Sequence, residues 1–489
     1  MIATEMAPLA KVGGLADVVG ALPHALARLG HEVRVVLPRY QSIDAARHGI
    51  KPGPGGAPVA VFAARGSANG PRGAKVTVHL IENEKHFGRT GIYNDPKDAR
   101  GYPDNAERFI FFQKAALALL KEIGFKPDVI HCHDHQTALI PAYLLMMKDS
   151  FFSGTGTLFT VHNLGYQGLF PPETMEMAGF ERSLLYTMGP FEFYGQMNFM
   201  KAGLALADLI TTVSPTYARE ICSPDQGAGL EGVLQSRRAD LHGVLNGIDD
   251  GYWNPSKDTH LKNRYSVDDL AGKNECRKAL LKEMGIPAGR KRVPVIGIIS
   301  RLTEQKGFDL IEKAIPALME RDLMIVALGA GEERYVNMLR DAQAKFPKKV
   351  ALRVGFDEAL AHLIEAGSDM FLMPSRYEPC GLNQMYSLAY GTVPVVRSTG
   401  GLADTVREVA KDDAPANGFV FDGYDASAMQ EAIARALDAF ADKKRWAGLM
   451  KAGMRGDYSW ARSARLYEEL YKQAKKKSSE RATSSTQVA

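Results

Sequence analysis

The 489-residue sequence contains no uninterrupted apolar run of about 18 residues, which is the length that a membrane-spanning helix requires. Its N-terminus lacks the succession of basic, apolar and small residues that is typical of a signal peptide. The four cysteines, Cys132, Cys222, Cys276 and Cys380, form no C-x-x-C pair, which argues against a disulfide framework and a zinc site. We therefore expect a soluble, unexported protein of the reducing cytoplasm with no membrane partner.

The sequence also lacks a strong charge of either sign. Lys and Arg number 60 and Asp and Glu 56, and the resulting net charge of +4 is too small to indicate a nucleic-acid partner. The absence of a G-x-G-x-x-G fingerprint and of a ribose-binding acid argues against a nicotinamide-dependent oxidoreductase. Hydrophobic residues make up 45% and charged residues 24%, an ordinary balance for a chain of roughly two to four domains.

Apolar runs alternate with helical patterns through both halves of the chain, which predicts mostly parallel, doubly wound α/β sheets. In the first half, a strand tail at 1–6 precedes predicted strands at 32–37, 75–81, 128–132, 157–161 and 209–213 and helices at 15–29, 105–123, 136–147 and 197–207. In the second half, strands are predicted at 293–300, 323–328, 350–354, 369–373, 393–396 and 418–421.

These patterns predict two Rossmann-like domains, at 1–250 and 251–455, with a ligand cleft between them. The amphipathic segment at 456–475 is expected to form a helix that crosses back to the first domain. The polar end of the chain, 476–489, is expected to be disordered. Gly and Pro are dense at 51–73, which predicts an irregular excursion around one short strand.

A polar turn around Glu378 is the first candidate for a ligand site. It joins the apolar run at 369–373 to a helical pattern that starts at Leu382. Open α/β sheets bind ligands at such turns, where amides after Gly381 would be free donors at a helix N-terminus. An ordinary βα turn with a solvated glutamate is the alternative. The Cys380 thiol suggests a nucleophile, but neighbouring amides already supply donors for a ligand.

Two cations follow the first predicted strand of the second half. Arg301 and Lys306 lie in the turn SRLTEQKG, where an arginine fork and a lysine point charge together suit a diphosphate. Glycine-rich turns at 329–331 and 398–401 end two further strands and offer hydroxyl and amide donors. Several such turns in one sheet indicate a site for a nucleotide diphosphate.

The turn KVGG opens the first half. Lys11, Gly13 and Gly14 lie between the strand tail and a helix, and glycines allow a backbone to approach a phosphate or sugar closely. A turn that only requires positive φ explains the same residues, and at this spacing both interpretations stay open.

Histidines gather at the end of another predicted strand. His131, His133 and His135 flank Asp134, and strand alternation would place the three imidazoles on one face, so a metal site has to be considered. A sugar-facing polar turn is favoured because no further carboxylate and histidine set accompanies them. His162 ends the next strand, together with Asn163, and either side chain can hydrogen-bond hydroxyls.

Taken together, the motifs resemble those of the bacterial glycogen (starch) synthases, the ADP-glucose-type enzymes of glycosyltransferase family 5. The matching segments occur in the family order: KVGGLADV (11–18), DNAERF (104–109), HNLGYQG (162–168), LNGID (245–249), SRLTEQKG (300–307), EPCGL (378–382) and STGGLADTV (398–406). The combination of KVGGL, SRLTEQKG and EPCGL is highly specific.

The resemblance implies the GT-B architecture, in which two Rossmann-like domains form an interdomain cleft. It implies a retaining glucosyltransferase that elongates an α-1,4-glucan at its non-reducing end, with ADP-glucose and the glucan as partners and with no metal or other cofactor. A UDP-glucose-using transferase of the same fold and a non-catalytic glucan-binding homologue are the alternatives.

The resemblance also assigns roles to single residues. The residues expected to take part in catalysis are Arg301, Lys306, Glu378, His162 and Asp17, the first two by neutralising the leaving diphosphate. The residues expected to bind substrate are Lys11, Gly13, Gly14, Asp134, Asn163, Asn246, Phe356, Cys380, Gly381, Leu382 and Thr399, with Phe356 stacking on adenine and Thr399 contacting phosphate.

Three positions depart from the family pattern. The first strand starts a few residues later than the family's, so we expect either a truncated strand or a misassigned start. His135 stands where the family often has tryptophan, which leaves acceptor contacts there open. Tyr386 occupies the position of a second glutamate in related retaining transferases, although synthases of this type resemble this sequence in lacking it.

Overall fold

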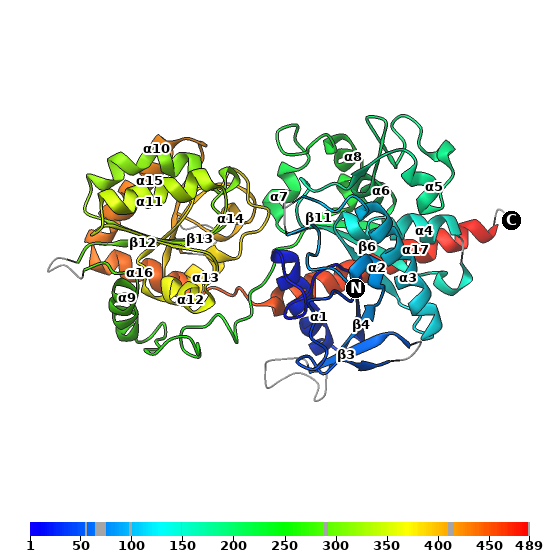
Figure 1. Ribbon diagram of the computed structural model, residues 1–489, viewed down its shortest axis with the longest axis horizontal. Helices are drawn as coiled ribbons and strands as arrows, with labels where there is room; N and C mark the ends of the chain where they lie inside the picture. Colours follow the sequence, from blue (N-terminus) through cyan, green and yellow to red (C-terminus); the bar gives the residue numbers. More distant parts are fainter. Residues whose placement is uncertain are drawn as a thin grey trace. The chain divides into compact units, whose positions relative to one another are not determined.

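The computed structural model describes residues 1–53, 56–63, 75–96, 100–147, 149–287, 292–408 and 415–487. Packing divides the chain into two compact units (Figure 1). Unit 1 comprises Met1–Gly247 together with Trp460–Ala489, and unit 2 comprises Ile248–Ser459. The sequence interpretation placed these transitions at residues 250 and 455.

Unit 2 is built on a parallel six-stranded sheet with the order β14-β13-β12-β15-β16-β17. The chain therefore starts in the middle of the sheet, builds outward to one edge, and returns to build the other half. This doubly wound order creates a topological switch point between β12 and β15, where such sheets bind ligands. The strands are β12 (Val295–Ile299), β13 (Met324–Gly329), β14 (Val350–Val354), β15 (Met370–Met373), β16 (Val393–Arg397) and β17 (Phe419–Phe421), and each coincides with a predicted strand.

Helices cover both faces of this sheet. The sequence of β13, MIVALG, is apolar throughout and buried throughout, as expected for a parallel strand covered on two sides. One hydrophobic core lies under α10, α11 and α15 and the other under α9, α12 and α13 (Figure 1). The helices are α9 (Ala271–Glu283), α10 (Phe308–Met319), α11 (Glu333–Lys345), α12 (Glu358–Gly367), α13 (Asn383–Ala389), α14 (Gly400–Thr405), α15 (Ala426–Ala441) and α16 (Lys443–Met454).

The sheet of unit 1 has the same doubly wound logic. Its two blocks, β2-β3-β4-β1 and β5-β6-β10-β11, are joined by the N-terminal segment, because Ile2 makes parallel bridges to both Val36 and Cys132. The predicted strand tail thus occupies the centre of the sheet, and the switch point lies between it and β5. The main strands are β1 (Val33–Pro38), β4 (Lys75–Ile81), β5 (Val129–His133), β6 (Gly156–Val161), β10 (Leu209–Thr212) and β11 (Leu241–Gly243).

Shorter strands complete unit 1. An antiparallel edge is formed by β2 (Lys51–Pro52) and β3 (Pro58–Ala63), within the excursion predicted at 51–73; residues 64–73 of that prediction lie outside the described residues. A separate small sheet contains β7 (Leu169–Phe170), β8 (Glu192–Phe193) and β9 (Gln196–Asn198). The helix predicted from residue 197 starts later, at Phe199, because Met197 and Asn198 pair in β9 and the Asn198 side chain caps the helix by accepting from the Lys201 amide.

The helices of unit 1 include further corrections to the sequence interpretation, since the helix predicted at 136–147 starts only at Ile140. They are α1 (Gly14–Arg28), α2 (Glu84–Phe87), α3 (Asn105–Glu122), α4 (Ile140–Met147), α5 (Thr174–Ala178), α6 (Phe199–Leu206), α7 (Pro215–Glu220), α8 (Glu231–Ser236) and α17 (Trp460–Gln487). The tail expected to be disordered from residue 476 instead continues α17. Ion pairs of Lys475 with Asp128 and of Arg481 with Asp208 hold this polar helix on unit 1.

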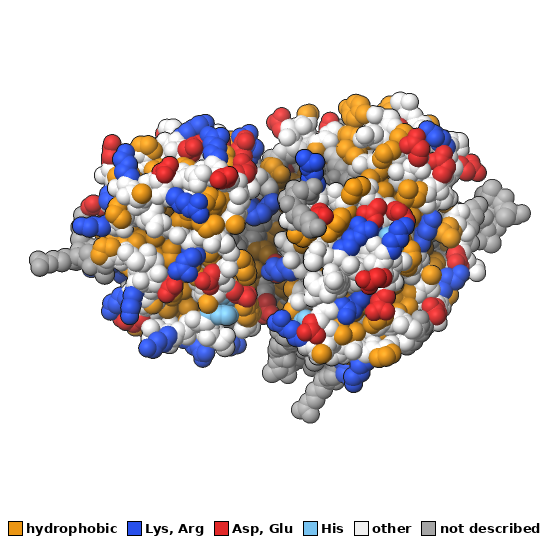
Figure 2. Space-filling view, in the orientation of Figure 1, with side chains coloured by type: hydrophobic (Ala, Val, Ile, Leu, Met, Phe, Trp, Pro, Cys, Tyr) orange, Lys and Arg blue, Asp and Glu red, His pale blue; other side chains and the backbone are white. Residues whose placement is uncertain are grey.

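Two surface properties complete the description. On the face shown in Figure 2, basic and acidic side chains are interspersed over both units. No helix in the described ranges combines the length and the apolar character that crossing a membrane requires.

Candidate active site

The switch point of unit 2 carries a cavity of about 210 Å³. It lies at the carboxyl ends of β12 and β15, where the turns SRLTEQKG and PSRYEPCGL leave the sheet. The cavity is lined by Ile298, Ile299, Ser300, Arg301, Lys306, Leu372, Met373, Ser375, Glu378, Gly381, Leu382 and Asn383. The doubly wound topology therefore brings together the two turns singled out from the sequence.

Charged side chains are paired inside this cavity. The Lys306 ammonium donates to the Glu378 carboxylate at 2.6 Å, and the Ser375 hydroxyl donates to the same oxygen at 2.9 Å. Glu378 is buried and Lys306 is mostly buried. Arg301 is exposed and donates to the Gln305 side chain at 3.1 Å. Two cations and one carboxylate leave the site with an excess of positive charge.

Glycines allow the turns to approach one another. A Cβ atom on Gly307, which has φ of +79°, would lie 2.1 Å from the Pro374 carbonyl oxygen. A Cβ on Gly400 would lie 1.9 Å from the Glu378 carbonyl oxygen, and the Gly401 amide donates to that oxygen at 3.2 Å. Side chains at these positions would force the three turns apart, so the glycines are needed to assemble the cavity.

The remaining predicted residues of unit 2 have different environments. Cys380, within the second cavity turn, and Thr399, at the start of α14, are buried, and neither is among the described residues that line the cavity. Gly381 and Leu382 do line it, and Gly381 has φ of +71°. Phe356 lies outside it, two residues beyond the end of β14, with a side chain that is 85% exposed.

Sequence reasoning missed three polar residues of this cavity, Ser300, Ser375 and Asn383. Ser375 holds the Glu378 carboxylate, and the Asn383 amide group donates to the Ile299 carbonyl at 2.6 Å, which ties the start of α13 to the end of β12. Ser375 lies in the turn that had been singled out, so its hydroxyl was visible in the sequence. The Asn383 contact joins segments distant in the sequence and had no such signal.

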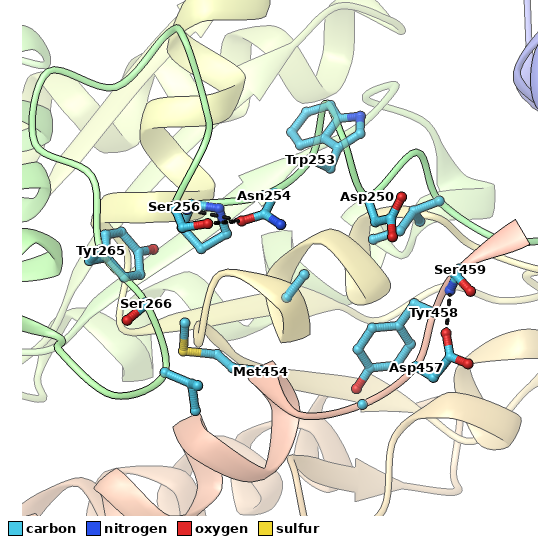
Figure 3. A pocket seen from close by; sticks show the side chains of 15 residues that line it. Asp250, Trp253, Asn254, Ser256, Tyr265, Ser266, Met454, Asp457, Tyr458 and Ser459 are labelled. Atoms are coloured by element: carbon cyan, nitrogen blue, oxygen red, sulfur yellow. Dashed lines mark hydrogen bonds between the residues drawn. The ribbon is translucent and has the colours of Figure 1, made fainter. Parts of the chain in front are cut away.

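A larger hollow of about 260 Å³ lies where the chain enters and leaves unit 2 (Figure 3). Its polar groups are largely bonded to one another: Asn254 accepts from the Ser256 amide and hydroxyl, and Asp457 accepts from the Ser459 amide. The described residues that line it include the acids Asp250 and Asp457 and no Lys or Arg. This lining suits a phosphate poorly, so the smaller cavity is the better candidate for a diphosphate.

In unit 1, the KVGG turn follows the N-terminal strand segment at the switch point. The Lys11 ammonium lies 2.6 Å from the Asp17 carboxylate, and both side chains are partly exposed. Gly13 is extended and precedes the first residue of α1, Gly14, which has open space at its Cβ position. Predicted Lys11, Gly13, Gly14 and Asp17 therefore form one local group.

The turn after β5 presents Asp134, whose φ is +57°. Its carboxylate accepts from the His162 amide at 2.7 Å, which joins this turn to the end of β6. Burial raises the pKa of Asp134 to about 7, although the hydrogen bond from the His162 amide lowers it. Burial lowers the pKa of His162 to about 3, so its imidazole is neutral at pH 7. These two groups can exchange hydrogen bonds with hydroxyls.

The neighbouring histidines are engaged with protein groups. His131 contacts the Tyr471 hydroxyl at 2.8 Å and the Thr160 hydroxyl at 2.6 Å, and His133 lies 3.1 Å from the His162 ring nitrogen. Burial lowers the pKa of His131 and His133 well below the usual range. Among the described residues, no group of three His, Cys, Asp or Glu side chains is arranged to hold a metal ion.

Asn163 and Asn246 complete the predicted set in unit 1. The Asn163 side chain accepts from the Gly165 amide at 2.9 Å and so shapes the HNLG turn. Asn246 is buried, and its side-chain oxygen has no hydrogen-bond partner within the described ranges. A buried amide oxygen without a donor is a position where a substrate hydroxyl would improve the hydrogen bonding.

Family models match both halves of the chain. Residues 1–236 match the starch synthase catalytic domain, and residues 282–447 match the glycosyl transferases group 1. The fold is also shared with distant structures: sucrose-phosphate synthase from Thermosynechococcus elongatus superposes with a TM-score of 0.59 at 18% identity, over 96% of this chain and 97% of that one.

Close relatives cover nearly the entire chain. A glycogen synthase of Geotalea uraniireducens is 49% identical over 97% of this chain and 98% of its own length, and one of Anaeromyxobacter dehalogenans is 49% identical over 96% and 98%. The catalytic domain of starch synthase IV from Arabidopsis thaliana, solved with ADP and acarbose, matches with a TM-score of 0.85 and 35% identity over 97% of this chain and 98% of that chain. The predicted GT-B class with two Rossmann-like domains is therefore confirmed, and the chain belongs to the glycogen synthase family of glucan-elongating glucosyltransferases.

Proposed function

We propose that this enzyme transfers glucose from ADP-glucose to the non-reducing end of an α-1,4-glucan, with retention of the α configuration and release of ADP. The observation that carries the proposal is the position of Arg301 and Lys306 in one cavity at the switch point of unit 2. Nucleotide phosphates bind at this place in doubly wound sheets.

Charge supports the diphosphate assignment. Cleavage of the bond from glucose C1 to phosphate increases the negative charge on the departing ADP. The exposed guanidinium of Arg301 can grip phosphate oxygens as a fork, and Lys306 has donors left after its bond to Glu378. Each such donor contributes roughly 3 to 4 kcal/mol to stabilising developing anionic charge.

The base of the donor is assigned to Phe356. Its ring is exposed just beyond the end of the edge strand β14, where it can receive a planar base. The Arabidopsis relative was solved with ADP, which supports an adenine nucleotide here. Thr399 is a proposed phosphate donor on the neighbouring turn.

The transferred glucose unit is assigned to polar groups with matching chemistry. Neutral His162 can donate to or accept from a sugar hydroxyl, and Asp134, with a pKa of about 7, can do the same. Asn246 supplies its unpaired amide oxygen, and Asp17, Lys11 and Asn163 are proposed neighbours of the sugar.

Retention requires attack on the face from which ADP departs, or two successive displacements. Glu378 is the carboxylate in the cavity, and one of its oxygens already accepts from both Lys306 and Ser375. This pairing lowers its nucleophilicity and suits a residue that orients the sugar. We therefore favour same-face attack by the glucan 4-hydroxyl, with a phosphate oxygen of the departing ADP taking the proton.

The test is glycogen elongation with ADP-glucose and UDP-glucose side by side, followed by proton NMR of the fresh product. We expect a clear preference for ADP-glucose and an α linkage. A preference for UDP-glucose would overturn the donor assignment, and a β linkage would overturn retention. Absence of transfer from either donor would favour the non-catalytic, glucan-binding alternative.

A cytoplasmic location is part of the proposal. All four cysteines are free of disulfide bonds, as expected in a reducing compartment. Fractionation of cells with an antibody to this chain would test it, and recovery outside the cytoplasmic fraction would contradict it.

A further inference from the structure

We propose that Glu5 is a positioning residue that holds the Lys11–Gly14 turn in its substrate-binding form. This inference rests on the proposed role of that turn in binding the donor, and it assigns a purpose to a side chain that the sequence motifs leave unexplained. Glu5 belongs to the N-terminal strand segment, and its side chain is almost completely buried at 4% exposure.

Both oxygens of the Glu5 carboxylate are occupied by short hydrogen bonds. One oxygen accepts from the Val12 amide at 2.6 Å and from the Gly13 amide at 2.8 Å. The other accepts from the Tyr93 hydroxyl at 2.8 Å. Hydrogen bonds to an ionised acceptor are roughly twice as strong as neutral ones, so this carboxylate fixes the backbone on both sides of the Val12–Gly13 peptide.

The two amides lie directly before the first residue of α1, at the end of a helix that attracts anions. Glu5 thus supplies an internal anion to the turn. The same bonds orient the neighbouring Lys11, whose ammonium reaches the Asp17 carboxylate. Loss of the carboxylate would remove the acceptor that both the Val12 and the Gly13 amides share, and the turn would have to rearrange.

Two residues of the DNAERF motif, Asn105 and Arg108, stabilise the segment that carries Tyr93. Asn105 donates from its side chain to the Tyr93 carbonyl at 3.0 Å and accepts from the Arg108 guanidinium at 2.6 Å. Arg108 is fully buried and also donates to the Ile92 carbonyl at 3.0 Å. The motif therefore fixes the segment that carries Tyr93, and Tyr93 in turn fixes Glu5. Figure 1 shows α3, which contains this motif, and α1 within unit 1.

A purely structural carboxylate would explain the burial of Glu5 and no more. The positioning role makes a stricter demand, because its loss must affect one substrate more than the other. In the proposed function the sugar of the donor lies next to the turn, and no contact between the glucan and the turn is assigned. Kinetics with each substrate varied in turn can therefore separate the two roles.

The experiment compares Glu5→Ala and Glu5→Gln with the wild type. In Glu5→Ala, we expect kcat/KM for ADP-glucose to fall by about tenfold or more, because the loss of one charge-assisted hydrogen bond corresponds to a factor of about that size. The KM for glycogen should stay within about twofold of the wild type. Glu5→Gln keeps an oxygen that the two amides can share, and its amide group can donate to Tyr93, so it should recover most of the donor kinetics.

The matched control is Glu107→Gln. It neutralises another carboxylate of the same unit, inside the DNAERF motif, but Glu107 is partly exposed and pairs with Lys85 on the surface. Its kinetics should match the wild type. Hydrogen exchange of ligand-free protein, read on peptides that cover residues 9–16, provides a second measurement that needs no activity. Exchange there should rise in Glu5→Ala and remain near the wild-type rate in Glu107→Gln.

Two results for Glu5→Ala would overturn the proposal: equal losses of kinetic efficiency when ADP-glucose and when glycogen is varied, or unchanged hydrogen exchange in residues 9–16. If Glu5→Ala fails to fold, the kinetics of Glu5→Gln provide the test. Loss of nearly all activity with ADP-glucose in this variant would contradict the role of one Glu5 oxygen as the shared acceptor for the two amides. Failure of the proposed function itself looks different, because the wild type would then show no transfer from ADP-glucose, while the exchange measurement would still report on the turn.

Discussion

The Lys306 ammonium and the Glu378 carboxylate form an ion pair of 2.6 Å inside the unit 2 cavity. The two residues come from turns that follow different strands, so the pair forms only when the sheet is assembled. It gives a buried carboxylate a cationic partner beside the cavity. A bound diphosphate would share this lysine with Glu378, and the site residues therefore depend on one another.

Arg301→Ala and Lys306→Ala should each lower kcat about 100- to 1,000-fold, because each removes a proposed donor to the departing phosphate. Arg301 is exposed, so its replacement should leave the free energy of unfolding within about 0.5 kcal/mol of the wild type. Initial rates and urea unfolding would measure both effects. Arg340→Ala, at an exposed arginine of α11 in the same unit, is the control and should retain full turnover. Normal turnover in both site variants would exclude the leaving-group role.

Glu378→Gln should separate binding from turnover. The neutral amide releases Lys306 from its ion pair, so ADP should bind at least as tightly as to the wild type, as measured by calorimetry. Turnover should fall because the carboxylate proposed to orient the sugar is gone. Glu312→Gln, which neutralises a surface acid paired with Arg334, should change neither quantity. Tenfold weaker ADP binding in Glu378→Gln would show that the carboxylate supports the nucleotide.

Chelation should leave activity unchanged. In the described part of the chain no cluster of three potential ligands can hold a metal ion, and the imidazoles of His131 and His133 are engaged with Tyr471, Thr160 and His162. Initial rates before and after dialysis against EDTA would check this. Loss of activity, followed by recovery with a divalent ion, would restore the metal interpretation of the histidine cluster.

Acid should destabilise unit 1 through buried neutral histidines. Burial lowers the pKa of His79 to about 4, and in the described structure neither of its ring nitrogens has a hydrogen-bond partner. Between pH 6.5 and about 4, His79 therefore binds a proton in the unfolded chain but not in the folded chain. Its contribution to the free energy of unfolding is fully present above this range and is lost as the pH falls through it.

His79→Leu removes this contribution. Between pH 6.5 and 4.5 the wild type should lose about 2 to 3 kcal/mol more unfolding free energy than the variant, because each pKa unit corresponds to 1.36 kcal/mol. Urea unfolding at a series of pH values provides the measurement. His48→Leu, at a partly exposed position of unit 1, is the control and should follow the wild-type curve. Parallel curves for His79→Leu and the wild type would contradict the assignment.

Local patterns in the sequence were sufficient for the strands and for the main site turns. The apolar runs that became β12 and β15 are short and bounded by polar turns, so their place in a doubly wound sheet followed from alternation alone. Arg301, Lys306 and Glu378 lie in those turns, and the topology makes their meeting at one edge predictable.

Contacts between distant segments could not be predicted in this way. The hydrogen bond between Glu5 and Tyr93 joins residues that are 88 positions apart in the sequence. A buried glutamate in a strand tail also leaves no periodic pattern that would predict it. The C-terminal segment was misread for a related reason. Its polar composition argues against packing, whereas its helix is held by ion pairs to Asp128 and Asp208, whose positions only the folded sheet determines.

Unit 1 is completed by the last part of the chain, and this affects how the protein is made. Tyr467 and Ala474 of α17 are fully buried, and Ala474 packs so closely on Gly156 that a Cβ there would lie 2.6 Å from the Ala474 backbone. A nascent chain that has reached Gly247 therefore still exposes the apolar surface that α17 covers in the folded protein. Unit 2 must be synthesised before α17 can complete the fold of unit 1. Until then, the part of unit 1 that is synthesised first remains incomplete, with apolar surface that favours aggregation.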